Sequence, residues 1–110
     1  MPGRQPTGEK VYALAGTTET LDLSKVGRVF AGTVTAACVI TLTNAPLGYT
    51  ELHFYLTNPH TNFDIVACLW AAGTKTLTQT GIDYLKVGVY RTSSATVIFQ
   101  AGKELALADN

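Results

Sequence analysis

Hydrophobic and polar residues alternate along most of this chain with a period of two. In the stretch 20–23, for example, Leu21 and Leu23 fall on one face while Thr20 and Asp22 fall on the other. A period of two is typical of a β-strand that buries one face. The inward-facing set expected from this alternation is Leu21, Leu23, Cys38, Ile40, Leu42, Leu52, Phe54, Leu56, Phe63, Ile65, Ala67, Leu85, Val87, Val89, Val97 and Phe99.

Turn signals separate these alternating segments. They include "NAPLGYT", "NPHTN", "TGID" and "TSS", and about eight or nine strands lie between them. No segment keeps a period of 3.6 residues over three turns, so less than about a tenth of the residues is expected to be helical. The seventeen threonines suit strands with one packed and one wet face. The pattern predicts an all-β protein, an antiparallel β-sandwich of jelly-roll type, with the sandwich domain at 11–101 and a C-terminal tail at 102–110.

Residues 1–10 have a different composition and are expected to form an extended N-terminal arm. The arm contains two prolines and two glycines and has no apolar run, while Arg4, Gln5 and Lys10 give it polar groups. Such a segment cannot form a packed core. We expect it to lie across a neighbouring subunit or a partner protein, and the alternative is a frayed chain terminus.

Charge excludes some classes of partner. Charged residues make up 15% of the chain, and eight Lys and Arg balance eight Asp and Glu. Nucleic acids and anionic membranes attract basic proteins, so neither is an expected partner. Zero net charge also leaves little repulsion between copies of the chain. With neither a membrane-length apolar run nor a signal peptide, synthesis in the cytoplasm is expected.

No group of residues has the spacing of a catalytic or metal site. Cys38 and Cys68 lie in apolar segments without CxxC spacing, and we interpret them as two buried thiols, with a disulfide as the alternative. His53 is expected on an outward face and His60 in a turn. The carboxylates that could form a general acid/base pair lie on separate segments of the chain. No nucleophile elbow or phosphate-binding loop occurs in the sequence. The sequence therefore predicts a protein that is not an enzyme and uses no cofactor or metal.

Tyrosines are the most informative polar side chains. They fall mainly in turns or on outward faces, and a tyrosine ring buries a large area at an interface while its hydroxyl keeps a partner. Because basic residues are not interleaved with them, a protein interface is favoured over nucleic-acid stacking. The candidate contact residues are Arg4, Gln5, Lys10, Tyr12, Tyr55 and Tyr90.

The run "TETLDLSKVGRVFAGTVTAACVITLTNAPLGYTELHFYLTN", followed by "FDIVACLW" and "TLTQTGIDYLKVGVYR", resembles a β-rich domain of tailed-bacteriophage virion proteins. The similar part spans residues 20–91, which is most of the chain. In that family the domain occurs in tail fibres, head fibres and small capsid proteins.

The resemblance implies a small capsid decoration protein, also called a cement protein. Such a protein would bind the major capsid protein on the outside of the assembled head, as a dimer or trimer, and would brace the shell. The implied location is the virion, after synthesis in the host cytoplasm. Two alternatives remain open: a tail, fibre or spike component, and a carbohydrate-binding module.

Overall fold

The computed structural model describes residues 9–70, 77 and 80–101. The predicted C-terminal tail, residues 1–8 of the predicted arm, and most of the threonine-rich segment before residue 80 lie outside the described residues. The described part contains no helix. Its strands are β1 (Val11–Ala13), β2 (Glu19–Asp22), β3 (Val29–Thr33), β4 (Val39–Thr43), β5 (Gly48–Thr57), β6 (Asp64–Ile65), β7 (Cys68–Leu69), β8 (Ile82–Arg91) and β9 (Thr96–Gln100).

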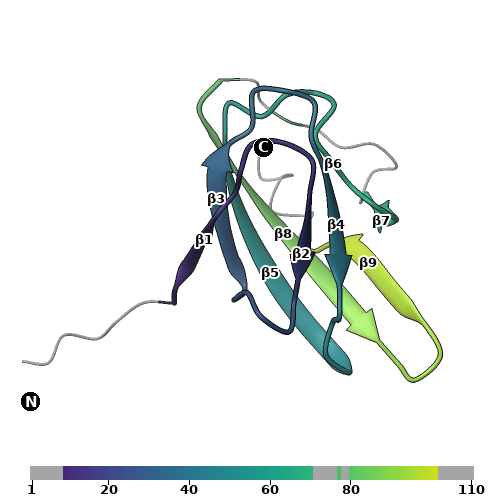
Figure 1. The fold of residues 1–110 in the computed structure, drawn as a ribbon. Coiled ribbons are helices and arrows are strands. Elements are labelled where there is room, and N and C mark those ends of the chain that lie inside the picture. Colours follow the sequence, from purple (N-terminus) through teal and green to yellow (C-terminus); the bar gives the residue numbers. More distant parts are fainter. Residues whose placement is uncertain (1–8, 71–76, 78–79, 102–110) are drawn as a thin grey trace, which may run out of the picture.

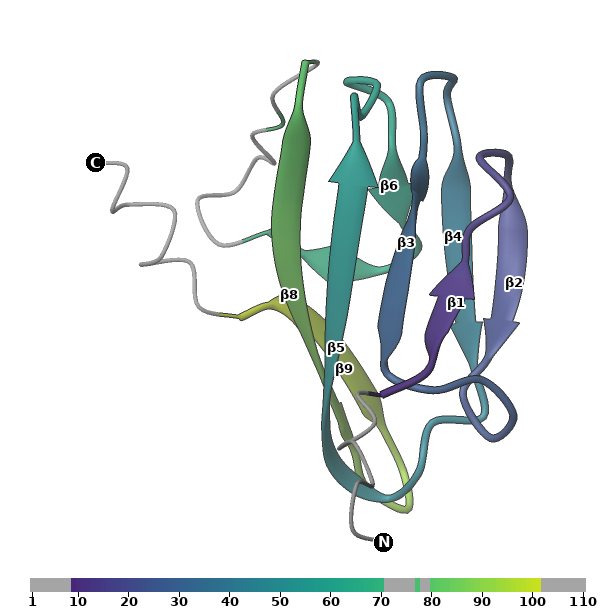
Figure 2. The same cartoon turned by 90° about the vertical axis from the view of Figure 1, so that its left-hand side faces the viewer.

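Two sheets face each other as layers (Figures 1 and 2). The large sheet has six strands in the order β1-β3-β5-β8-β9-β7, and the small sheet has three in the order β2-β4-β6. From β1 to β6 the chain alternates between the sheets, one strand in each. The prediction of an all-β fold is confirmed, and the two layers are compatible with a sandwich.

The expected antiparallel arrangement is wrong. Among the described residues, five of the seven strand pairings are parallel, and only β5–β8 and β8–β9 are antiparallel. The cause is the alternation between layers, because strands two apart in the chain become neighbours that run in the same direction. Tyr12, Phe30 and Phe54 therefore hold the same register position in β1, β3 and β5. The jelly-roll prediction is not confirmed by these pairings, since a jelly roll is built from antiparallel strands.

The core lies between the two layers and follows the predicted alternation closely. Phe30 and Phe54 are fully buried and their rings stack, with centroids 4.8 Å apart. The described buried hydrophobic residues are Leu14, Leu21, Phe30, Val34, Cys38, Ile40, Ala45, Leu52, Phe54, Leu56, Phe63, Ile65, Leu85, Val87, Val89 and Ile98.

Two inward predictions are wrong in β9. Val97 is exposed and Ile98 is buried instead, because the register with β8 places Ile98 opposite the buried Val89. Phe99 consequently lies on the outer face, opposite Gly88. Three apolar residues in a row leave the phase of the alternation ambiguous, so pairing with β8 decides it.

A third inward prediction, Ala67, is also wrong. The residue is exposed and has a φ of 63°, a left-handed conformation that interrupts extended structure. The predicted strand "FDIVACLW" is therefore split. Its first part, β6, joins the small sheet, and its second part, β7, joins the large sheet.

Candidate functional site

The outer face of the large sheet carries most of the exposed large hydrophobic side chains. Ten such side chains are exposed in the described part of the chain, and eight of them lie on this face. Exposed apolar side chains gathered on one face are typical of an interaction surface. The eight are Val11, Tyr49, Tyr55, Leu69, Ile82, Tyr84, Tyr90 and Val97.

The long pairing of β5 with β8 aligns these side chains. It continues without a break from Gly48 opposite Arg91 to Thr57 opposite Ile82. Alternate residues point to opposite faces, so every second residue of both strands faces outward. The centre of the site is what we call the aromatic face, which consists of nine outward residues of β5, β8 and β9: Tyr49, Glu51, His53, Tyr55, Tyr84, Lys86, Tyr90, Val97 and Phe99.

One group of rings on this face surrounds Tyr84. Tyr84 lies opposite Tyr55, with ring centroids 5.0 Å apart, and diagonally beside His53, with centroids 5.8 Å apart. The Tyr84 hydroxyl and His53 Nδ1 share a hydrogen bond of 2.6 Å. Burial raises the pKa of the Tyr84 phenol, and the nearby Tyr55 and Glu51 add smaller contributions in the same direction. Tyr84 therefore stays neutral at physiological pH and is held by its neighbours.

A second ring pair lies at the other end of β8. Tyr49 and Phe99 stack with centroids 6.1 Å apart, over Gly88. A Cβ at position 88 would lie 2.6 Å from Phe99 Cζ and 2.8 Å from Tyr49 Cε1, so the glycine leaves the space that both rings occupy. Tyr49 donates a 3.0 Å hydrogen bond to Glu51 Oε2. Burial first, and then this bond to Glu51, raise the pKa of Tyr49.

The charged groups of the aromatic face neutralise one another. Glu51 and Lys86 form an ion pair of 3.8 Å, and both side chains are partly exposed. A pair of this kind contributes little to stability, in the range of about 0–1 kcal/mol. Its effect on the site is to leave a surface without net charge, which favours an apolar or neutral polar partner over a phosphate or a strongly charged protein.

The structure places the predicted contact residues in different regions. Tyr55 and Tyr90 lie on the aromatic face, together with Tyr49 and Tyr84. Tyr12 lies at the edge between the layers instead, because it shares the inward register of Phe30 and packs edge-on against that ring at 5.9 Å. Its hydroxyl donates a 3.0 Å hydrogen bond to Glu19 Oε1, which links the two sheets.

The predicted basic contacts are not brought to the aromatic face. Lys10 lies beside a separate hollow of about 110 Å³ that Tyr12, Lys25, Val26 and Gly27 also line. Glu9, next to it, forms an ion pair with Arg28. Arg4 and Gln5 lie outside the described residues.

Sequence reasoning missed several members of the aromatic face. Val97 and Phe99 are predicted to face inward, and Tyr49 and Tyr84 are not among the predicted contact residues. The available signal was the segment "YLKVGVYR", in which the two tyrosines occupy the face opposite Leu85, Val87 and Val89. Nothing in the sequence showed that β5 would pair with β8 and double this row.

Both cysteines are free thiols, but the prediction that both are buried is wrong for Cys68, which is only partly buried. Cys38 is buried, and its Sγ donates a 3.1 Å hydrogen bond to the Thr17 carbonyl. Burial raises the pKa of Cys38, and burial together with the Asp64 charge raises the pKa of Cys68 to about 12. A thiol with a raised pKa is a poor nucleophile at neutral pH. The two thiols are not joined as a disulfide in this structure, and the raised pKa values do not favour nucleophilic chemistry at either one.

The described residues lack two other kinds of feature. They contain no group of three or more His, Cys, Asp or Glu side chains placed to hold a metal ion. They also contain no helix with the length and apolar character needed to cross a membrane.

No protein-family model matches this chain, and the comparisons found no similar curated protein and no similar solved structure.

Proposed function

We propose that this chain is a structural protein that works by association, with the aromatic face as its contact surface. The observation that supports this is the row of uncovered tyrosines on β5 and β8, with the stacked Tyr49–Phe99 pair beside it. Aromatic rings are enriched at protein interfaces because they bury a large area with few rotatable bonds. Exposed rings that already contact one another lose little further freedom when a partner covers them.

The partner in this proposal is the major capsid protein of a tailed bacteriophage. It rests on the sequence resemblance of residues 20–91, together with the neutral character of the aromatic face. The chain would bind the outside of the assembled head as a decoration protein. A protein that binds only the assembled, expanded shell stabilises that shell by mass action.

The proposal also includes association of the chain with copies of itself, as a dimer or trimer. A symmetric oligomer joins several weak capsid contacts into one strong attachment. The arm at residues 1–10 would add contact area on a neighbouring subunit or on the capsid. The chain then acts without catalysis, cofactor or metal, and it needs neither nucleic acid nor a membrane.

The experiment that tests the proposal is the addition of purified protein to expanded heads that lack it. The protein should coat the heads at high copy number and raise the temperature at which they open. The Tyr84→Asp variant should bind at least tenfold more weakly, because a carboxylate would be desolvated in the contact. Thr35→Asp, which places the same charge in an exposed loop between β3 and β4, should bind as the wild type does.

Other outcomes of this experiment count against the proposal. Binding of a few copies at the tail, with none on the head surface, would support the tail, fibre or spike alternative. No binding to either structure would overturn the virion assignment.

A carbohydrate-binding module is the second candidate, and one observation favours it. His53, Glu51 and Lys86 place polar groups beside the exposed tyrosine rings, and sugars are bound by rings with polar neighbours. A glycan array tests this directly. Retention of a defined oligosaccharide that is lost in Tyr84→Ala would replace the capsid proposal.

A further inference from the structure

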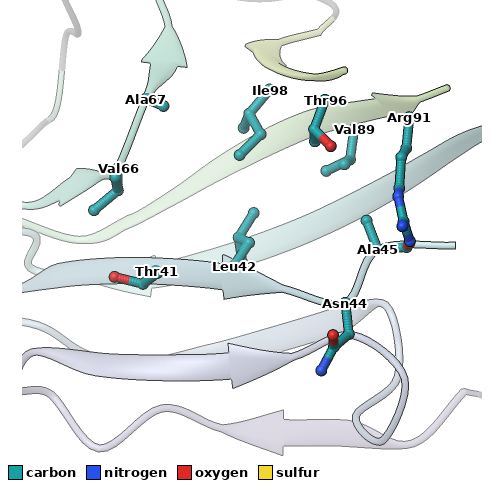
Figure 3. A pocket seen from close by; sticks show the side chains of 10 residues that line it. All are labelled: Thr41, Leu42, Asn44, Ala45, Val66, Ala67, Val89, Arg91, Thr96 and Ile98. Atoms are coloured by element: carbon teal, nitrogen blue, oxygen red, sulfur yellow. The ribbon is translucent and has the colours of Figure 1, made fainter. Parts of the chain in front are cut away.

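A cleft of about 410 Å³ opens at the side of the sandwich, between β4 of the small sheet and β9 of the large sheet (Figure 3). Val66 and Ala67, where the chain crosses from β6 to β7, lie toward one end of the cleft. Arg91 and Ala45 lie toward the other end. The remaining lining is half apolar, with Leu42, Val89 and Ile98, and half polar, with Thr41, Asn44 and Thr96.

The cleft exists because the edge strands on this side are very short. In the small sheet, β6 pairs with β4 only at Val39 and Ile40. In the large sheet, β7 pairs with β9 only at Ile98 and Phe99. The remaining lengths of β4 and β9 flank the cleft, and in the described part of the chain no strand pairs with them on that side.

The backbone of Leu42 faces this open edge. The carbonyls of Cys38 and Ile40 accept hydrogen bonds of 2.9 Å from the backbone N–H groups of Asp64 and Val66. Backbone groups that face one edge recur at every second residue of a strand, so Leu42 is the next to face it. Its N–H and C=O are therefore in position to pair with a further strand.

One end of the cleft is cationic. Arg91 Nη1 donates a 2.5 Å hydrogen bond to the Ala45 carbonyl, which fixes the guanidinium near the end of β4. Of the ion pairs in the described part of the chain, none includes Arg91. A guanidinium has five N–H donors, and the remaining ones suit a carboxylate.

We propose that the cleft is an acceptor site for an extended segment of a partner protein, which would add a strand beside β4. The segment would present apolar side chains at alternate positions to Val89 and Ile98, and a carboxylate to Arg91. Strand addition of this kind combines backbone hydrogen bonds with pockets for alternate side chains. The site is distinct from the aromatic face, because Val89 and Ile98 face the interior while their neighbours Tyr90 and Val97 face outward.

The first test is an NMR titration of the full-length protein with the capped peptide acetyl-TLTLTD-amide. The amide signals of Leu42, Thr43 and Thr96 should move, and those of the aromatic face should stay in place. Replacing the peptide's aspartate with asparagine should weaken binding about tenfold, the effect of losing a charged hydrogen bond. Arg91→Gln should weaken binding of the aspartate peptide by the same factor and leave the asparagine peptide nearly unchanged.

A second pair of variants separates this site from the proposed function. Val66 and Val97 are similarly exposed, at 45% and 41%, but Val66 lines the cleft and Val97 lies on the aromatic face. Val66→Asp should weaken peptide binding at least tenfold and leave association through the aromatic face intact. Val97→Asp should weaken association through the aromatic face and leave peptide binding intact. Equal effects of both variants on peptide binding would overturn the cleft as the site.

The last test distinguishes strand addition from a pocket for small amphipathic molecules. A peptide N-methylated at alternate backbone nitrogens keeps its side chains and loses the donors that face β4. It should bind at least tenfold more weakly than the unmethylated peptide. Unchanged binding of the methylated peptide, or binding of octanoate that moves the same signals with higher affinity, would overturn strand addition.

Discussion

Tyr55 and Tyr84 lie directly opposite each other on β5 and β8, with ring centroids 5.0 Å apart and an interplanar angle of 33°. Both rings are exposed on the outer face of the large sheet. Opposed aromatic side chains on one sheet face stabilise the pairing of their strands by about 0.2–1 kcal/mol. The same pair leaves apolar area uncovered, so it contributes to the fold and also forms the centre of the proposed contact surface.

Replacing Tyr84 with Asp should weaken self-association and leave the fold intact. The side chain is exposed, so the free energy of unfolding should fall by only about 1 kcal/mol. A carboxylate in the contact would lose its water without gaining a partner, and association should weaken at least tenfold. Sedimentation velocity across a range of concentrations measures the association.

Tyr84→Phe is the matched control for this prediction. It removes the hydroxyl that bonds His53 and keeps the ring, so association should stay within about threefold of the wild type. An aspartate variant that associates as the wild type does would show that the aromatic face is not the contact surface.

Gly88→Ala should disturb the ring pair above it. The new Cβ would lie 2.6 Å from Phe99 Cζ and 2.8 Å from Tyr49 Cε1, so at least one ring must move. Forcing atoms into an occupied position typically costs about 1–3 kcal/mol of unfolding free energy. Urea unfolding measures this cost, and ring-current shifts in the NMR spectrum report the displaced rings.

Gly27→Ala serves as the control for the glycine prediction. The nearest atom to a Cβ at that position is the Lys10 carbonyl oxygen at 3.5 Å, which is an ordinary contact distance. The free energy of unfolding of Gly27→Ala should differ from that of the wild type by less than about 0.5 kcal/mol. If both variants unfold at the same urea concentration, the crowding at Gly88 has no energetic consequence.

The sequence predicts the strands well because each strand of this fold buries one face. Leu52, Phe54 and Leu56 are fully buried as the alternation indicates, since that pattern is local to β5. The pairing of strands depends on contacts between residues far apart in the chain, which alternation does not encode. The parallel order β1-β3-β5 was therefore not predictable from this pattern alone.

In the candidate site, too, some side-chain positions follow from local alternation and others depend on contacts between distant parts of the chain. The outward position of Tyr55 follows from the alternation in β5 alone. The inward position of Tyr12 depends on its place at the edge between the sheets, where Phe30 and Glu19 receive its ring and hydroxyl. The outward position of Phe99 depends on the β8–β9 register.

Cys68 should react slowly with iodoacetamide in the folded protein. Its pKa of about 12 lies well above the ordinary cysteine value of about 8.5, so the thiolate fraction at pH 8 falls roughly a thousandfold. Unfolding in urea should restore fast alkylation of both thiols. Mass spectrometry of the time course measures the rates, and Cys38→Ser isolates the Cys68 signal.

A folded-state rate close to that of a free cysteine would contradict the raised pKa of Cys68. Such a rate would mean that the half-buried thiol meets water more often than the structure indicates.

Stability should decrease in alkaline solution as the tyrosines of the aromatic face ionise. The pKa values of Tyr49 and Tyr84 are raised in the folded state, chiefly by burial, so folding favours their neutral forms. For a raised pKa, the contribution to stability is complete below the unfolded value of about 10 and is lost as the pH rises through the folded value. The free energy of unfolding should therefore be insensitive to these two groups near pH 7 and fall above about pH 10. Urea unfolding at a series of alkaline pH values measures this decline in stability. The decline should be shallower in the double variant Tyr49→Phe/Tyr84→Phe. An equally steep decline in that variant would assign the loss of stability to other groups.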